Sequence, residues 1–310
     1  MADTGDPAPG WKQWIEAPQA ADGVPRGHPV VDRLVTLLDL ERIENDIFRG
    51  VSPSDSPSRV FGGQVAGQAL VAAGRTVPVE RSVHSLHAYF FRSGDPRVPI
   101  VYNVDRIRDG QSFTTRRVVA IQHGRAIFTL AASFQLPEQG LEHADEMPEV
   151  PAPEQLDDLA SWARRSGDSR PVLTQLPRPF DLRYITPPPW AGVRTEAGPG
   201  ARDQMWIRAD GDLPDDALLH VCVLAYASDL TVLWSVAIPH GRSLTDGVMA
   251  ASLDHSMWFH RPFRADDWVL CDYTSPSASG GRGLATGRFF SRDGRLIASA
   301  VQEGVIRVLR

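Results

Sequence analysis

A carboxylate, Asp229, lies in the middle of a long apolar segment, HVCVLAYASDLTVLWSVAIP, at residues 220–239. Apolar surroundings strip water from a carboxylate, which favours its neutral form and raises its pKa toward neutral pH. A carboxyl group tuned in this way suits general base catalysis, such as removing a proton from an attacking water. A structural alternative exists, because an Asp that follows Ser228 can also cap the start of a helix. The segment therefore predicts a catalytic base or a helix cap.

The same segment is long enough to span a bilayer. However, an Asp at the centre of a transmembrane helix costs roughly 2.5–3.5 kcal/mol on insertion. The sequence contains no second candidate span. We therefore expect a helix buried in a folded core, and no membrane insertion.

The other reactive side chains exclude several kinds of chemistry. Cys222 and Cys271 are too few for a disulfide scaffold and lack metal-type spacing, which fits a reducing compartment. Lys12 is the only lysine, so lysine nucleophiles and a P-loop are excluded from the patterned part of the chain. There is no G-x-S-x-G motif, which argues against an α/β-hydrolase. The glycines around Arg282 only approach a dinucleotide-binding motif and precede a strand rather than a helix.

The histidines do not predict a metal site. His255 and His260 are five residues apart, which suits neither one face of a strand nor a metal pair, and His84 and His87 have no carboxylate nearby in the sequence. We interpret Asp254, His255 and Trp258 as an inter-domain or subunit contact. No metal or other cofactor is expected.

Length and charge narrow the class of protein further. The chain has 310 residues, which suggests two domains, with 42% hydrophobic and 23% charged residues, as in folded globular proteins. Its net charge of −6 and isoelectric point of about 5.8 argue against a nucleic-acid partner. Residues 1–29 show no export signal and predict a flexible tail. Together with the reduced cysteines, this predicts a cytoplasmic protein.

Two patterned zones, residues 30–136 and 179–310, look like copies of one unit. They flank an acidic, Pro-rich linker, residues 137–178, which we expect to lie over the surface with a short helix near 154–165. Each unit has a helix of small and apolar residues, at 62–76 and about 214–237. The sequence predicts strands before and after each helix. In the first unit a strand at 41–48 precedes the helix, and strands at 83–92, 98–108, 112–122 and 125–135 follow it. In the second unit strands at 181–186 and 204–209 precede the helix, and strands at 253–260, 267–275, 283–291 and 295–308 follow it.

Hairpin turns and matching residues support the duplication. Gly124 and Gly294 each lie in a predicted turn and are followed by Arg, and Gly110 matches Gly280 at the same offset. A repeat of this length predicts a duplicated domain rather than a solenoid. Each unit reads as an antiparallel sheet wrapped around one helix. Because some strands are apolar on both faces, we expect the two sheets to cover each other.

Several long motifs in this order resemble acyl-CoA thioesterase II, the TesB-like family. They are VFGGQVAGQALVAA (60–73), HSLHAYFFRSGDP (84–96), AYASDLTVL (225–233), LDHSMWFHRPF (253–263) and VQEGV (301–305). The resemblance covers nearly all of residues 30–310. It implies an α+β double hotdog fold, in which two tandem units each wrap an antiparallel sheet around a long helix, and an acyl-CoA thioesterase that releases a free fatty acid and CoA. It also implies association into a homodimer or homotetramer.

The family's catalytic set is an Asp, a Thr or Ser, and a Gln, all from the second unit. Carried over by motif, the set becomes Asp229, Ser252 and Gln302, with Ser at the position where the family often has Thr. These groups would activate one water without a covalent acyl-enzyme. Without the resemblance, Gln302 predicts only a structural hydrogen bond between strands. Candidate oxyanion donors are backbone N–H groups near Gly63, within the glycines of 62–67, or near Ser228.

Other residues complete the predicted site. Arg264 and Arg282, with Arg261, are candidates for CoA phosphate contacts, since Arg suits bidentate phosphate binding, or are solvated surface charges. In the first unit Gln68 is aligned roughly opposite Asp229, and a neutral amide cannot act as the base. Trp190, Trp206, Trp234 and Phe113 are candidates for the acyl tunnel, and the chain-length preference stays open.

Two alternatives to hydrolysis stay open. One is an enoyl-CoA hydratase of the same fold, although the Asp and His pair typical of such enzymes is not found near either helix. The other is a non-catalytic acyl-CoA binding or sensing protein, which has no need for a buried carboxylate.

Overall fold

The structure of the protein, a computed structural model, describes residues 28–53, 59–166, 179–188, 198, 200–242 and 247–308. Lys12, Trp190 and nearly all of the predicted tail lie outside these residues. The helices are α2 (His28–Leu38), α3 (Gly62–Gly74), η1 (Pro153–Gln155), α4 (Leu159–Ser166), α6 (Ala217–Ser228) and η2 (Val232–His240). The strands are β1 (Glu41–Glu44), β2 (Ile47–Gly50), β3 (Ser82–Phe90), β4 (Ile100–Asp109), β5 (Phe113–Gln122), β6 (Arg125–Gln135), β7 (Phe180–Tyr184), β8 (Arg202–Ala209), β9 (Val248–Ser252), β10 (Asp254–Phe259), β11 (Val269–Ser279), β12 (Arg282–Ser291) and β13 (Leu296–Val308).

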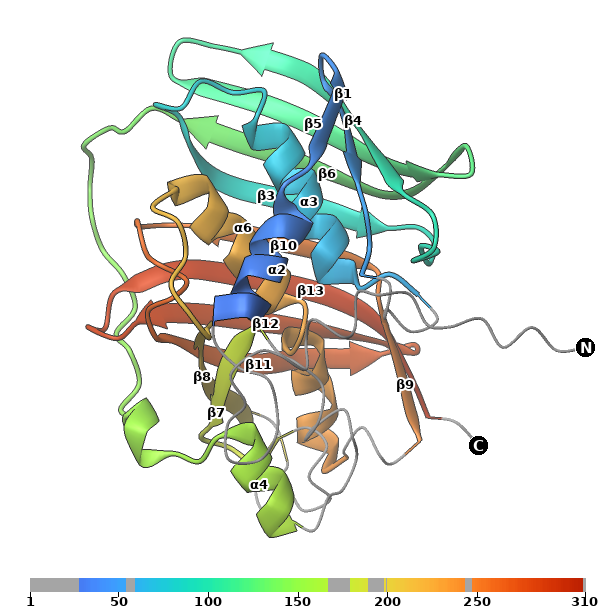
Figure 1. The fold of residues 1–310 in the computed structure, drawn as a ribbon. Coiled ribbons are helices and arrows are strands. Elements are labelled where there is room, and N and C mark those ends of the chain that lie inside the picture. Colours follow the sequence, from blue (N-terminus) through green and yellow to red (C-terminus); the bar gives the residue numbers. More distant parts are fainter. Residues whose placement is uncertain are drawn as a thin grey trace, which may run out of the picture.

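Two half-sheets join edge to edge into one antiparallel sheet (Figure 1). The first half runs β1-β2-β4-β5-β6-β3 and the second runs β10-β13-β12-β11-β8-β7, with β9 on β13. The join is the antiparallel pair β3–β10, where His255 lies opposite Ala88 and Trp258 opposite Ser85. The expectation that the two sheets cover each other is therefore wrong. Pairing of the two edge strands instead satisfies backbone groups that exposed edges would leave open.

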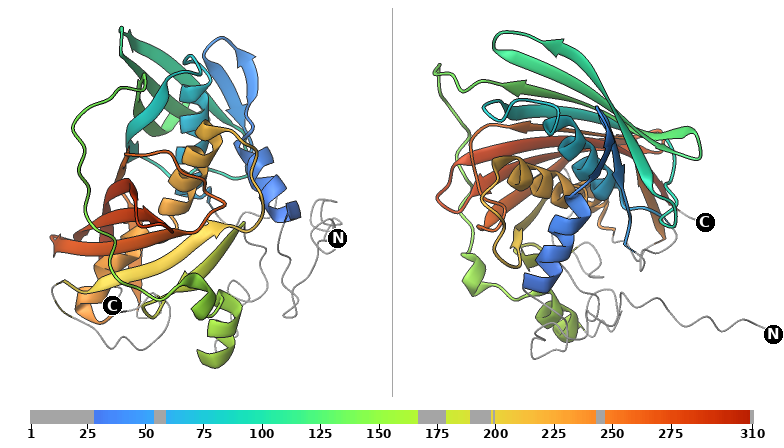
Figure 2. Two further views of the ribbon diagram at one scale, coloured as in Figure 1. Left: turned by 90° about the vertical axis from the view of Figure 1, so that its left-hand side faces the viewer. Right: turned by 45° about the horizontal axis from the view of Figure 1, so that its top comes forward.

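The central helices α3 and α6 lie side by side within the curve of the sheet (Figures 1 and 2). Their contact is close because α3 presents glycines there. A Cβ on Gly63 would lie 2.3 Å from the carbonyl oxygen of Tyr226, and one on Gly67 would lie 3.3 Å from that of Cys222. Helix α3 packs mainly on the first half-sheet, and η2 packs on β11, β12 and β13 of the second. This is the predicted double hotdog fold, with a sheet wrapped around a helix in each half.

The second central helix is interrupted, contrary to the single helix predicted at about 214–237. Helix α6 ends at Ser228, Asp229 follows as its C-terminal cap residue, and η2 begins at Val232 as a 3₁₀ helix. Within the described residues, Ala217–His240 is long and apolar enough to cross a membrane, and 72% of its most apolar window is buried inside the fold. The burial agrees with the prediction of a core helix.

The described part of the linker, residues 137–166, lies over the outer face of the second half-sheet, as predicted. Met147, Val150 and Leu156 pack on a small apolar cluster that includes Trp206 and Phe290. The indole Nε1 of Trp206 donates to the carbonyl of Pro151 at 2.9 Å. The short helix predicted near 154–165 is confirmed as α4, and η1 precedes it. The apolar outer face of these strands is therefore explained by the linker.

Most strand predictions are confirmed to within a few residues, and the differences are local. The predicted strand 41–48 is a hairpin of β1 and β2, with Asp46 at a positive φ of 61° in its turn. Helix α2 and strand β9 were not predicted. The predicted turn at Gly124 is confirmed, because His123 and Gly124 have φ values of 50° and 69°, as a tight hairpin requires.

Candidate active site

Asp229 lies where α6 ends, and its carboxylate reaches the start of α3 in the other half of the chain. The backbone N–H of Gly63, in the first turn of α3, donates to this carboxylate. The residue before α3, Phe61, offers no side-chain cap, whereas α6 is capped locally by Asp216, which accepts from the N–H groups of Leu218 and Leu219. Asp229 thus supplies the anion that the N-terminus of α3 lacks.

The approach of Asp229 to α3 requires glycine at two positions. A Cβ on Gly62 would lie 2.6 Å from Asp229 Oδ2, and one on Gly63 would lie 2.3 Å from the Tyr226 carbonyl oxygen. Both distances are shorter than a van der Waals contact allows. The glycines of the first unit and the carboxylate of the second therefore form one site, built from both halves of the molecule.

Ser252 and Gln302 meet Asp229 from the second half-sheet. Gln302 Nε2 donates to Asp229 Oδ1 at 2.7 Å and to Ser252 Oγ at 2.7 Å, and Ser252 Oγ donates to Asp229 Oδ1 at 3.4 Å. Gln302 is fully buried in β13, whereas Ser252 and Asp229 retain some accessible surface. The structure therefore brings together the three side chains predicted from motifs. The N–H of Gly63, predicted as a donor to the substrate oxyanion, lies at the same place but donates to Asp229. We call these four groups the Asp229 cluster.

A shift in strand register places Ser252 beside Gln302. Strand β13 pairs with β9 through Gly304 and Ser252, and with β10 through Val301 and Ser256. The chain therefore holds one extra residue between β9 and β10 relative to β13, as in a β-bulge. Bulges reorient side chains next to functional sites. Here the irregularity keeps Ser252 on the same face of the sheet as Gln302.

Burial raises the pKa of Asp229 to about 6, although the hydrogen bonds from Gln302, Gly63 and Ser252 favour its charged form. The carboxylate is therefore mostly ionised at neutral pH, yet basic enough to take a proton. A base works best with a pKa near the operating pH. Of the two interpretations left open by the sequence, the helix cap exists in a modified form, because the Asp229 side chain accepts from the first turn of α3 and not from a helix that follows it in the chain.

The counterpart in the first unit, Gln68, is not at this site. Its Nε2 donates to the carbonyl of Leu37 at 2.6 Å, and its Oε1 accepts from the hydroxyl of Tyr102 at 2.7 Å. These partners all belong to the first unit. The buried amide therefore has a structural role, and the described residues contain no second Asp229-like cluster in the first unit.

The two candidate phosphate-binding arginines lie away from the Asp229 cluster. Arg282 pairs with Glu303, whose side chain points to the opposite face of the sheet from that of Gln302. Arg264 pairs with Asp266 and Asp215. Arg261 donates to the carbonyl of Leu296. A role for Arg264 or Arg282 in CoA binding stays a prediction.

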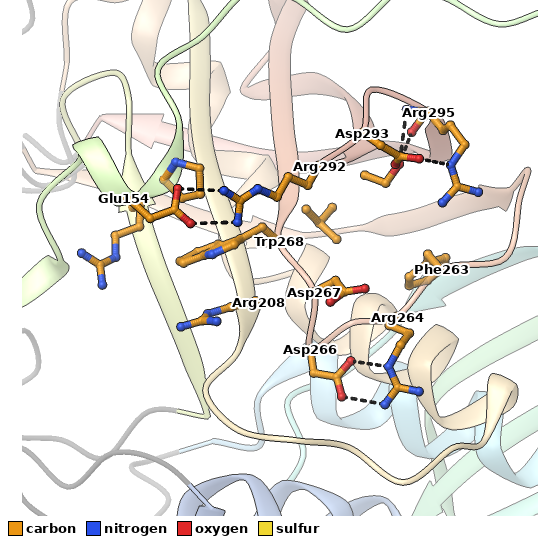
Figure 3. Close-up of a pocket in the computed structure, with 14 residues that line it drawn as sticks. Glu154, Arg208, Phe263, Arg264, Asp266, Asp267, Trp268, Arg292, Asp293 and Arg295 are labelled. Atoms are coloured by element: carbon orange, nitrogen blue, oxygen red, sulfur yellow. Dashed lines mark hydrogen bonds and ion pairs between the residues drawn. The ribbon is translucent and has the colours of Figure 1, made fainter.

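Arg264 lies in an open pocket of about 770 Å³ formed by the segment between β10 and β11, the β12–β13 hairpin, the linker and strands β7 and β8 (Figure 3). Figure 3 shows its arginines facing carboxylates, with Arg264 on Asp266 and Arg292 on Glu154. Arg208 stacks on Trp268 at 4.5 Å from the ring centroid. The lining residues do not include any member of the Asp229 cluster, so this pocket is a separate feature of the surface.

Other residues singled out in the sequence lie elsewhere in the fold. Within the described part of the chain, no three His, Cys, Asp or Glu side chains are grouped so that they could hold a metal ion. Both cysteines are free and buried. Trp206 packs under the linker on the outer face rather than near Asp229, and Phe113 is 40% exposed. The strand that carries His255 forms the predicted inter-domain contact through β3.

Comparisons with known proteins agree with this geometry. The sequence profile described as acyl-CoA thioesterase matches residues 185–305, which include Asp229, Ser252 and Gln302. The profile described as acyl-CoA thioesterase N-terminal domain matches residues 52–135, which include Gly63. The two matches therefore coincide with the two halves of the sheet.

Individual relatives are similar over most of the chain. Acyl-coenzyme A thioesterase 8 of Mus musculus is 42% identical over 290 residues, which cover 89% of this chain and 89% of the mouse protein. Acyl-CoA thioesterase 2 of Haemophilus influenzae is 41% identical over 285 residues, covering 90% of this chain and 98% of that protein. The crystal structure of an acyl-CoA thioesterase II from Mycobacterium marinum superposes with a TM-score of 0.73 and 44% identity, covering 88% of this chain and 97% of that one.

Proposed function

The chain belongs to the acyl-CoA thioesterase II family and is an acyl-CoA thioesterase by homology, and on that premise we propose that it hydrolyses fatty acyl-CoA at the Asp229 cluster. The observation that carries the proposal is the set of hydrogen bonds that Gln302, Ser252 and the Gly63 N–H make to one carboxylate whose pKa is raised to about 6.

In the proposed mechanism Asp229 is the general base. Each carboxylate oxygen has two lone pairs, so the carboxylate can accept its hydrogen bonds and still take a proton from water. The water oxygen attacks the thioester carbonyl carbon, and the resulting tetrahedral intermediate collapses with cleavage of the carbon–sulfur bond. CoA leaves as the thiolate and takes the proton held by Asp229, which restores the base, and the other product is the free acid. General base catalysis of this kind contributes about 10²–10⁴ in rate.

Ser252 and Gln302 orient the carboxylate in this scheme. Both protons of the Gln302 amide are used, one on Asp229 and one on Ser252. The charged carboxylate is thereby held in one rotamer, which is what a near-attack geometry requires. The N-terminus of α3 adds a partial positive charge on the other side. The neutral amide Gln68 offers no such base in the first unit.

Thiol release from acyl-CoA tests the activity. We expect the purified chain to release CoA thiol, detected with a thiol-reactive dye, from acyl-CoA substrates over a range of chain lengths. The rate measured for each acyl chain length would show which substrates the enzyme prefers. Binding of acyl-CoA without thiol release would instead favour a sensor, and hydration of an enoyl-CoA with no thiol release would favour a hydratase.

We expect Ser252→Thr to keep kcat/KM within about fivefold of wild type. This corresponds to a change of less than about 1 kcal/mol in the activation free energy. Threonine retains the hydroxyl that accepts from Gln302, and β-branched residues suit a strand such as β9. The matched variant Ser252→Ala leaves a Gln302 donor unpaired and is expected to lose about 10- to 100-fold. Steady-state thiol release compares the two. A folded Ser252→Thr protein without activity would exclude Ser252 from the proposed set.

Association and location are also proposals. A homodimer or homotetramer and a cytoplasmic location stay predictions from the sequence and the family resemblance. Light scattering on the purified chain measures the oligomeric state.

A further inference from the structure

His255 lies directly across from Gln302 in the sheet. Strands β10 and β13 are antiparallel, and Ser256 pairs with Val301. By the same register His255 is the cross-strand neighbour of Gln302, and the two side chains share one face of the sheet. His255 is fully buried, as is Gln302. The side chains of an imidazole and an amide are therefore held against each other in the core, next to Asp229.

The hydrogen-bonding capacity of the two side chains is complementary. Gln302 Nε2 uses both protons on Asp229 and Ser252, and His255 Nε2 lies 2.9 Å from the hydroxyl of Ser228. Two buried atoms remain, His255 Nδ1 and Gln302 Oε1, and neither has a hydrogen-bond partner among the described residues. Buried polar atoms of this kind are rarely left unpaired.

Burial lowers the pKa of His255 to about 4, while the Gln302 side chain beside it acts in the opposite direction. The ring is therefore neutral near pH 7 and carries one N–H. When that proton is on Nδ1, Nε2 accepts from the Ser228 hydroxyl and Nδ1–H donates to an oxygen. The opposite tautomer would place a lone pair against Gln302 Oε1, or would require the amide to turn its oxygen toward the Asp229 carboxylate.

We propose that His255 is a positioning residue, whose Nδ1–H donates to Gln302 Oε1 and so fixes the amide with Nε2 on Asp229 and Ser252. This inference rests on the proposed function of the Asp229 cluster. With Nδ1 protonated in this way, Nε2 must accept the hydroxyl proton of Ser228, whose Oγ also lies 3.0 Å from the carbonyl oxygen of Ala225. An amide can rotate by 180° at little steric cost, so the nitrogen and oxygen ends of Gln302 are distinguished only by their partners. Without His255 the flipped amide would present oxygen to a carboxylate.

The first unit offers a matched histidine without this arrangement. The pair His84-Ser85 of the first unit matches His255-Ser256 to within one residue in the sequence repeat. His84 is only partly buried, and its Nε2 contacts the hydroxyl of Ser133 at 2.8 Å. Its ring packs edge-on against Phe113. None of these contacts involves the Asp229 cluster, so substitutions of His84 serve as controls.

Two substitutions distinguish the roles of the two ring nitrogens of His255. In His255→Asn the amide nitrogen can take the place of Nδ1, whereas in His255→Gln it reaches the place of Nε2 and leaves Gln302 Oε1 without its donor. We expect His255→Asn to retain kcat within about fivefold, and His255→Gln to lose about 10- to 100-fold in kcat with KM little changed. His84→Asn and His84→Gln should both keep wild-type kcat. Thermal unfolding confirms that each variant is folded.

A double-mutant cycle with Gln302→Ala decides whether His255 acts through Gln302. Positioning predicts that His255→Gln lowers kcat in the wild-type background but causes no further loss in the Gln302→Ala background. Equal losses in both backgrounds, or equal losses for His255→Asn and His255→Gln, would overturn the inference and leave the proposed function intact. Wild-type kcat in Gln302→Ala alone would overturn the role of Gln302 in the proposed function, and the positioning role with it.

Discussion

Asp229→Asn is expected to lower kcat for acyl-CoA hydrolysis by about 10²- to 10⁴-fold, because an amide of nearly the same shape cannot take a proton from water. Acyl-CoA binding should be retained, since no packing volume is lost. Thiol release under saturating acyl-CoA measures the effect, with binding followed separately by calorimetry. A folded Asp229→Asn protein that turns over at the wild-type rate would exclude Asp229 as the base.

Asp229→Asn is expected to stabilise the folded protein, although it lowers kcat. The pKa of Asp229 is raised from 3.8 to about 6 in the folded state by burial. The folded protein therefore binds this proton more tightly than the unfolded chain, and its free energy of unfolding falls as pH rises from about 4 to 6. The fall amounts to at most about 3 kcal/mol. Asp229→Asn removes this loss. The free energy of unfolding of the variant, measured with urea, should therefore rise relative to that of wild type between pH 4 and pH 8.

Gly63→Ala is the second change with a large expected effect. The new Cβ would lie 2.3 Å from the carbonyl oxygen of Tyr226, which is backbone and cannot rotate away. Helix α3 must therefore move off α6, and the Gly63 N–H moves off Asp229. Overpacking of this kind costs about 1–3 kcal/mol of stability. A displacement of about 1 Å at the base is expected to lower kcat by about 10²-fold.

Gly74→Ala is the matched control for Gly63→Ala. It lies at the other end of α3, and its Cβ would also be too close to α6, at 2.4 Å from Leu218 Cδ2. That atom belongs to a side chain that can change rotamer, and Asp229 is not involved. Gly74→Ala should therefore keep kcat. Steady-state kinetics and thermal unfolding are measured on both variants, and equal kcat values in the two folded proteins would contradict the role given to the start of α3.

The sequence predicted the local elements more accurately than their assembly. Alternating apolar residues and turns such as His123-Gly124 define most strands, because these signals lie within ten residues of one another. The edge pairing of β3 with β10 joins segments about 170 residues apart, and no local pattern encodes it. The sheets were therefore expected to face each other, although the linker covers the outer face of the second half.

In the candidate site, too, local features could be predicted from the sequence more accurately than contacts between distant segments. The position of Asp229 in an apolar segment predicted a carboxyl group with a raised pKa, but not its contact with Gly63, which comes from the other unit. Gln302 and Ser252 were identified through family motifs, since neither residue has a local signature. His255 was interpreted as an inter-domain contact, which its strand does form, while its ring faces Gln302. The signal for this second role was the antiparallel register of β10 and β13.

The dependence of kcat/KM on pH tests the central claim most directly, that a largely buried Asp229 carboxylate is the base. This parameter reports the ionisation of the free enzyme. The rate of acyl-CoA hydrolysis should rise with pH and level off above an apparent pKa of about 6, the value to which burial raises Asp229. A profile that is flat from pH 5 to pH 8, in a protein that stays folded over that range, would contradict the account.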